Sequence, residues 1–261
     1  MTSVRIFFKG GLTSYRAMFG WLHPGVAIPV FLIEPVAQIL LFAFIGRSAG
    51  VADDRFYVIG NALQFASIPC LFAMAFTIDG EREAHTLSVV LVSPARRLPL
   101  FLGRALPVIA NGWVVTLVGL VAGMLLLRVT IPGSAWLPML LVVLVSSASC
   151  TGLGLATGAV ALRVRDSAVL ANVVYCGLLI FSGVNVALDQ VPGWMADVGR
   201  WLPLTHAIEA ARRLADGQGV GSIGGLLVRE LGLGAAYTVL GLLMLRWLET
   251  SSRRWATLDR V

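Results

Sequence analysis

Long apolar runs alternate with short polar segments along most of the chain. Each run reaches the length of about 20 residues that an apolar helix needs to cross a bilayer. The pattern predicts six membrane-spanning helices, over residues 26–46, 56–78, 101–127, 136–162, 167–188 and 226–248. We therefore expect an all-α integral membrane protein, in which residues 1–261 form a single transmembrane domain.

The segment before the first span has a different period. In residues 3–22 the apolar positions recur on one helical face, which carries the aromatic residues Phe7, Phe8 and Tyr15 beside a basic stripe. Such a face is typical of a helix that lies in the membrane–water interface. We predict an N-terminal interfacial amphipathic helix here, with a disordered leader as the alternative.

Residues 79–97, DGEREAHTLSVVLVSPARR, separate the second and third spans. The segment begins with charged residues and continues as an apolar stretch that Pro94 would end, because proline does not continue a helix. Leu87, Val90 and Leu91 are spaced i, i+3, i+4 and would form one apolar ridge. The pattern favours a docking helix for a soluble partner, with a solvated loop as the alternative.

Residues 189–225 are neither a simple loop nor a span. Trp194 and Trp201 suit an interface, and residues 207–215 look helical before Gly217. We predict two short helices that dip back into the bundle from its surface.

Several polar residues interrupt the spans and are candidates for a substrate path. A carboxylate inside a span is costly and indicates a functional site. Asn61 and Gln64, three residues apart, share a helical face, where they line a cavity or bond between helices. Glu34, followed by Pro35, either faces a path or has a structural role, and Pro35 would kink the first span. The candidates are Glu34, Asn61, Gln64, Asn111, Asn172 and Asn185.

Composition supports the membrane assignment. Hydrophobic residues make up 57% of the 261, charged residues 13%, and mean hydropathy is +0.85. A soluble domain carries about 25% charged residues. The net charge of +6 reflects orientation in a membrane rather than binding to nucleic acid, and all three cysteines lie inside apolar runs.

Charge also predicts the orientation of the spans. With six spans, the side that holds both termini carries thirteen of the 20 Lys and Arg residues, and the other side carries seven. Positive residues favour the cytoplasm. We therefore expect a protein of the plasma membrane with both termini and residues 79–97 in the cytoplasm and residues 189–225 outside the cell.

Two stretches resemble the permease subunit of ABC type-2 exporters. The first runs from the motif ERE-x-x-TL at 81–87 through SP-x-RR to Gly103-Arg104, and departs from the family at His85 and Ser88. The second is P-x-W at 192–194 followed by LPLTHAIEAAR at 202–212. The resemblance implies that residues 79–97 are the coupling helix and that residues 189–225 are re-entrant helices. It implies ATPase contacts for Glu81, Arg82, Glu83, Thr86, Leu87, Val90 and Leu91, and a re-entrant role for Trp194, Pro203, Thr205 and Arg212.

The expected function is that of a permease subunit of an ATP-driven ABC exporter. The single lysine, Lys9, is not part of a P-loop, so we expect ATP and Mg on a partner ATPase and no cofactor on this chain. The three histidines are scattered, so we expect no metal site, and we expect no catalytic residues. Two ATPase copies and a second permease, identical or related, are the expected partners. The expected substrate is amphipathic: a drug, a lipid or a lipid-linked glycan. A proton-coupled secondary transporter that uses Glu34 and a non-transporting membrane scaffold are the alternatives.

Overall fold

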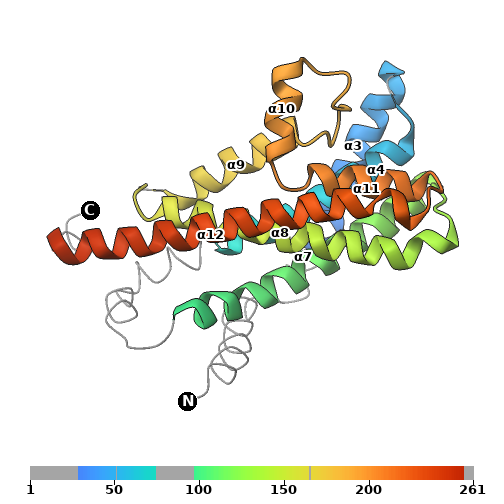
Figure 1. Cartoon of the computed structure of the whole chain (residues 1–261). Coiled ribbons are helices and arrows are strands. Elements are labelled where there is room, and N and C mark those ends of the chain that lie inside the picture. The colour runs from blue at the N-terminus through green and yellow to red at the C-terminus, as the bar shows by residue number, and fades with distance from the viewer. Residues whose placement is uncertain (1–28, 51, 75–96, 165, 256–261) are drawn as a thin grey trace.

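The computed structural model describes residues 29–50, 52–74, 97–164 and 166–255, and all regular structure in these ranges is helical (Figure 1). The elements are η1 (Pro29–Ile33), α3 (Glu34–Ala49), α4 (Asp54–Gln64), α7 (Arg97–Leu127), η2 (Gly133–Ala135), α8 (Trp136–Ala161), α9 (Ser167–Phe181), α10 (Gly193–Trp201), α11 (Thr205–Ala215), η3 (Val220–Ser222) and α12 (Gly224–Trp255). After a turn at 65–66, residues 67–74 are helical as well. The predicted interfacial helix at 3–22 lies outside the described residues.

Four helical stretches are long and apolar enough to cross a membrane. They are Asp54–Met74, Ala105–Leu127, Gly133–Ala161 and Gly224–Trp247, and they correspond to the second, third, fourth and sixth predicted spans. The first predicted span begins before the described residues, and its described part consists of η1 and α3. The apolar helix α9 has 15 residues. It is therefore about 22 Å long, against a hydrocarbon core of about 30 Å.

The last part of the fifth predicted span, residues 182–188, is not helical, so that end of the prediction is wrong. The helix ends at Phe181, and Gly183 follows with φ +75°, a left-handed conformation that glycine adopts without strain. The chain turns there, so Asn185 lies in the link between α9 and α10 rather than on a span. The residues after the turn are still mostly apolar, which is why the hydrophobic pattern did not mark the helix end. The last helix, in contrast, continues past residue 248 to Trp255.

Helices α8 and α12 lie side by side, and glycine makes their close approach possible (Figure 1). A Cβ on Gly234 of α12 would lie 2.7 Å from Ser149 Cα, and a Cβ on Gly241 would lie 2.8 Å from Ala156 N. A Cβ on Gly152 of α8 would overlap the carbonyl oxygen of Gly234. Backbone atoms cannot move aside as a side chain can, so these positions need glycine, and the two helices form one tightly packed pair.

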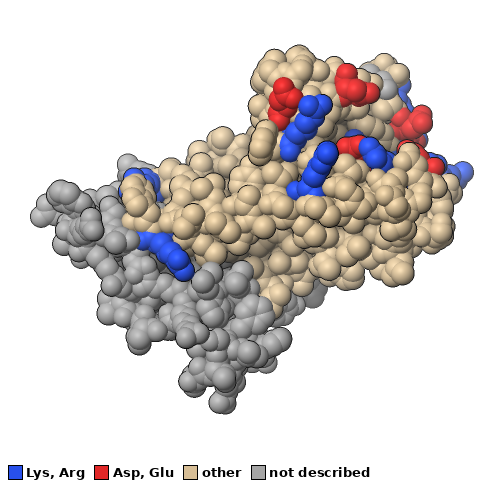
Figure 2. Space-filling view, in the orientation of Figure 1, with Lys and Arg blue, Asp and Glu red and all other residues tan. Residues whose placement is uncertain are grey.

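The bundle has two ends that differ in the elements they carry. At one end Arg55 Nη1 donates to the carbonyl oxygen of Ala215, 3.1 Å away, so the end of α11 lies beside the start of α4. At the other end the guanidinium carbon of Arg163 lies 4.2 Å from the ring centroid of Trp247. On the face drawn in Figure 2, charged side chains gather over α10, α11 and the α3–α4 turn, and an uncharged zone over α8 and α12 separates them from basic side chains at the other end. This distribution suits a bundle that crosses an apolar layer.

Candidate functional site

Uncharged polar side chains meet between α3, α4, α9 and the link that follows α9. Gln38 Nε2 donates to Asn61 Oδ1 at 3.1 Å, and Asn61 Nδ2 donates to Asn185 Oδ1 at 2.9 Å and to the carbonyl oxygen of Tyr57 at 3.0 Å. The hydroxyl of Tyr175 donates to Gln38 Oε1 at 3.3 Å. We call Gln38, Asn61, Asn185 and Tyr175 the amide cluster. Its members hydrogen-bond through neutral groups, so it suits a neutral hydrogen-bonding ligand better than an ion.

Gln64 lies one turn after Asn61 on the same face of α4 and is fully buried. Neither Oε1 nor Nε2 of its side chain has a hydrogen-bond partner within 3.5 Å among the described residues, and a polar neighbour, the hydroxyl of Tyr175, bonds to Gln38 instead. A buried amide without partners costs about 1–3 kcal/mol for each unsatisfied group, so such groups are rare in folded proteins. Packing alone therefore does not explain Gln64, whereas a bound polar group beside the amide cluster would.

The remaining residues predicted for the path have other positions. Glu34 is exposed at the start of α3, four residues before Gln38 and hence on the same helical face. Pro35 lies in the first turn of α3, directly after the π-helical turn Pro29–Ile33, and the backbone is helical on both sides of Glu34. A kink at Pro35 stays a prediction. Asn172 is exposed, and its Nδ2 donates to the carbonyl oxygen of Ala168 in its own helix at 2.9 Å.

Asn111 lies partly buried on α7. Among the described residues, the hydrogen bonds of the amide cluster do not extend to Asn111 or Asn172. The structure therefore brings Asn61 and Asn185 together, with Gln64 beside Asn61, and leaves Asn111 and Asn172 apart.

A buried carboxylate from α12 caps the start of α11. Glu230 is fully buried, and its Oε1 accepts a hydrogen bond of 2.6 Å from the backbone N–H of Leu204. Its Oε2 accepts one of 3.3 Å from the N–H of Ala207. The first N–H groups of a helix have no partner inside the helix and carry partial positive charge, so a carboxylate stabilises them. Leu204, with φ +84°, has no side-chain cap of its own, and Glu230 supplies the cap from another helix.

Arg212 of α11 holds the turn that follows α9. Its Nη1 donates to the carbonyl oxygen of Gly183 at 2.8 Å, and its Nη2 donates to those of Val184 at 2.8 Å and Phe56 at 3.2 Å. The guanidinium carbon also lies 3.4 Å from the ring centroid of Phe56. Burial lowers the pKa of Arg212 to about 9, which leaves the side chain charged at pH 7. Three carbonyl dipoles and an aromatic face thus stabilise the cation.

Replacing Arg212 with methionine is expected to lower the stability of the protein. The change removes three charge-assisted hydrogen bonds, each worth about 1.5–3 kcal/mol, but it also removes the cost of desolvating a buried cation, so we expect a net loss on the order of 3 kcal/mol. Thermal unfolding of the detergent-solubilised protein measures it. The control is Arg213→Gln, because Arg213 pairs with Glu209 at the surface, where an ion pair contributes about 1 kcal/mol at most. Equal effects of the two changes would contradict a special role for Arg212.

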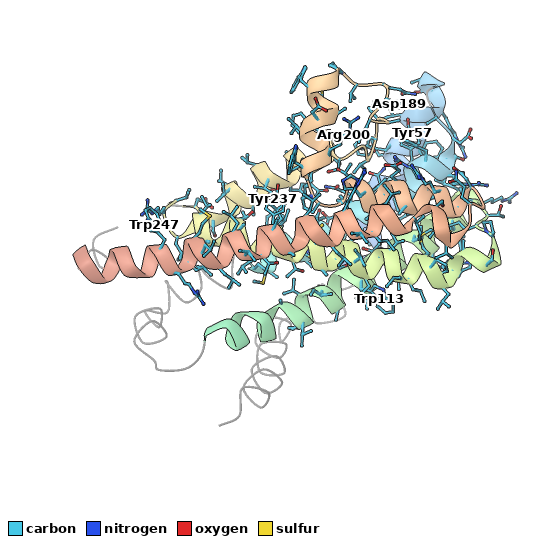
Figure 3. All side chains as sticks on the ribbon, in the orientation of Figure 1. Tyr57, Trp113, Asp189, Arg200, Tyr237 and Trp247 are labelled. Carbon is cyan, nitrogen blue, oxygen red and sulfur yellow. The ribbon has the colours of Figure 1, made fainter. Side chains whose placement is uncertain are left out.

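The two short helices predicted within 189–225 are confirmed as α10 and α11. Trp194 lies on α10 and is 63% exposed, whereas Pro203 and Thr205 are buried. Thr205 Oγ1 donates to the carbonyl oxygen of Gly199 at 2.7 Å, which ties α11 to α10. Figure 3 labels Tyr237 on α12, and its hydroxyl donates to the carbonyl oxygen of Trp201 at 3.0 Å. That the two helices re-enter the membrane stays a prediction.

The residues predicted to contact an ATPase lie outside the described residues. They are Glu81, Arg82, Glu83, Thr86, Leu87, Val90 and Leu91, and the structure describes the chain on either side of them, to residue 74 and from residue 97. Their helical conformation and their contacts therefore stay predictions.

Sequence reasoning missed three of the polar residues described above. Gln38 and Glu230 lie inside predicted spans, so the criterion applied to Glu34, a polar or charged residue in an apolar run, also selects them. Tyr175 is harder to find, because tyrosine is common in membrane helices and only its neighbours reveal a polar role.

Taken together, the geometry defines a multi-pass helical membrane protein that buries amides and the side chain of Glu230 between its helices and holds Arg212 partly buried beside them. A comparison with protein families matches residues 16–214 to the ABC-2 type transporter family. Because this match covers most of the 261 residues, the chain belongs to the ABC-2 type transporter family. It is therefore the membrane component of a transporter, and the family implies an ABC ATPase as partner. A comparison with curated proteins found no significant match.

Proposed function

We propose that this chain is the permease half of an ATP-driven exporter that moves an amphipathic substrate out of the cytoplasm. The observation that carries the proposal is the family match over residues 16–214, which includes both residues 79–97 and the amide cluster. In this proposal residues 79–97 receive the movement of a separate ATPase subunit, and the spans transmit it to the substrate path.

The partners follow from the same proposal. Two ATPase subunits bind ATP and Mg, and this chain itself binds no cofactor. A second permease, identical or related, completes the path, because one chain supplies only half of it. The chain lies in the plasma membrane with both termini in the cytoplasm, which the excess of Arg on that side supports. We propose no nucleic-acid partner.

The amide cluster supports a substrate with an uncharged polar part. Asn185 and Gln64 offer amide groups beside the phenol of Tyr175, and Asn61 holds Asn185 in place. Amides pair with hydroxyl and amide groups without the desolvation cost of a buried charge. A lipid, a lipid-linked glycan or a drug that carries such groups fits this chemistry.

The exposed face of α10 supports an external position for residues 189–225. Trp194, Val198 and Trp201 are exposed and spaced i, i+4, i+7, while Ala196 and Gly199 on the opposite face are buried. Figure 1 draws α10 across the direction of α8 and α12. Tryptophan prefers the membrane–water interface, so we infer that α10 lies along the outer interface, with α11 tucked beneath it.

Energy dependence tests the exporter against a proton-coupled carrier. In vesicles that contain the permease and its ATPase, we expect ATP depletion to stop transport and collapse of the proton gradient to leave it unchanged. A carrier that uses Glu34 gives the reverse result, and a scaffold that does not transport responds to neither treatment. Glu34→Gln gives a second comparison between the exporter and the carrier. Glutamine has no proton to exchange, so this variant should stop transport by a carrier that uses Glu34.

A further inference from the structure

The polar contacts of α11 connect α12, at the start of α11, with the amide cluster, at Arg212. We propose that Glu230 and Arg212 are positioning residues: Glu230 fixes α11 to the α8–α12 pair, and Arg212 makes the position of Asn185 depend on α11. A movement of α12 would thereby change the geometry of the amide cluster. The consequence for transport rests on the proposed function, whereas the mechanical link rests on the contacts alone.

The first contact joins α11 to the α8–α12 pair. The Glu230 carboxylate accepts the N–H groups of Leu204 and Ala207, and the Glu230 carbonyl oxygen accepts a hydrogen bond of 3.1 Å from Ser149 Oγ of α8. Leu204 is itself fully buried in the core. Separating the carboxylate from these backbone N–H groups is costly. Both the carboxylate and the N–H groups would then be buried polar groups without a hydrogen-bond partner. The start of α11 therefore has to follow α12.

The second contact joins α11 to the turn that carries Asn185. Arg212 lies seven residues after Thr205, on the same face of α11 two turns further on. Its guanidinium holds the carbonyl oxygens of Gly183 and Val184, and Val184 directly precedes Asn185. The same guanidinium contacts Phe56 of α4, five residues before Asn61. Arg212 thus fixes both chain segments that meet in the Asn61–Asn185 hydrogen bond.

Both charged groups are held by backbone rather than by each other. Among the described residues, Glu230 and Arg212 each lack a salt-bridge partner, and Glu209, on the same helix, pairs with Arg213 instead. Backbone N–H and C=O groups have fixed positions in a helix or a turn. These contacts therefore transmit displacement, whereas a pair of flexible side chains would absorb it.

Disulfide formation between engineered cysteines tests the link directly. The background is the full chain with the exposed Cys176 changed to Ser, because Cys70 and Cys150 are buried. The reporter pair is Asn61→Cys with Asn185→Cys. The reference pair is Arg47→Cys with Asp54→Cys, which replaces an ion pair between the end of α3 and the start of α4 that includes no residue of α11. The rate of disulfide formation under a mild oxidant is measured in membranes.

Glu230→Gln is expected to slow the 61–185 disulfide about tenfold and to leave the 47–54 disulfide unchanged, because the glutamine amide would direct an N–H toward a backbone N–H and leave it unpaired. Glu230→Asp keeps the carboxylate and should slow the 61–185 disulfide less than Glu230→Gln does. Arg212→Lys should act on the reporter pair like Glu230→Gln. The neighbouring residues give matched controls, since Arg229→Gln and Arg213→Gln should change neither rate.

An unchanged 61–185 rate in Glu230→Gln would overturn the proposal, because α11 would then keep its place without the cap. Equal slowing of both pairs would also overturn it, since Glu230 would then stabilise the whole bundle rather than position one part. The experiment needs neither ATP nor substrate. Its failure would leave the proposed exporter function intact, and loss of the exporter function would leave its result intact.

Discussion

The double variant Leu87→Asp/Leu91→Asp is expected to lose its ATPase subunit on purification and to lose substrate-dependent ATP hydrolysis. Leu87, Val90 and Leu91 would form one apolar ridge on a helix, and a groove on the ATPase is the natural partner for such a ridge. Buried apolar anchors often contribute about 2 kcal/mol or more, so the loss of even one weakens binding by roughly thirtyfold. Co-purification of the ATPase and its rate of hydrolysis measure the effect.

The control for this prediction is Val89→Asp. At 100° per residue Val89 points about 200° away from Leu87, so it would lie on the opposite face of the helix. The single variants Glu81→Gln and Glu83→Gln should also do less, because charges at the rim of an interface contribute little. If the double variant keeps both binding and hydrolysis at the unmodified level, residues 79–97 are a plain loop and the exporter proposal loses its docking site.

The membrane helices were the most predictable part of the fold. The predicted spans 101–127 and 136–162 end where α7 and α8 end, within one residue. Arg128 and Arg163 follow these ends, and the change from apolar to charged residues is what a hydrophobic pattern detects. The end of α9 was missed for the opposite reason. A turn that depends on the conformation of Gly183 changes direction without changing polarity.

The candidate site was predictable as a set of residues but not as an arrangement. Asn61 and Asn185 were selected because each is polar in an apolar run, yet they are 124 residues apart, and only the fold brings them into contact. Asn172 met the same criterion and bonds within its own helix at an exposed position. The burial and the partner of a polar residue decide between these outcomes, and neither is a local property of the sequence.

Asn61 and Gln64 provide the sharpest test of the candidate path, because they share a face of α4 but differ in their hydrogen bonds. Asn61→Leu removes the acceptor of Gln38 Nε2 and the donor to Asn185 Oδ1, so we expect it to lower the stability of the protein by about 2 kcal/mol. Loss of transport in that variant would not identify a path residue, because disruption of the fold would explain it equally well.

Gln64→Met is expected to raise stability while it lowers transport. Methionine is unbranched like glutamine and fills the same space, and the change removes two buried polar atoms that lack partners among the described residues. Removing such a group should gain about 1 kcal/mol, seen as a higher unfolding temperature in detergent. If Gln64 offers its amide to substrate, the same variant should transport more slowly at low substrate concentration. A stable variant with normal transport would exclude Gln64 from the path, and a less stable one would mean that its amide serves the fold. Stability gained together with transport lost is the combination expected of a residue kept for binding, because a binding site keeps polar groups free for the ligand at a cost to the fold.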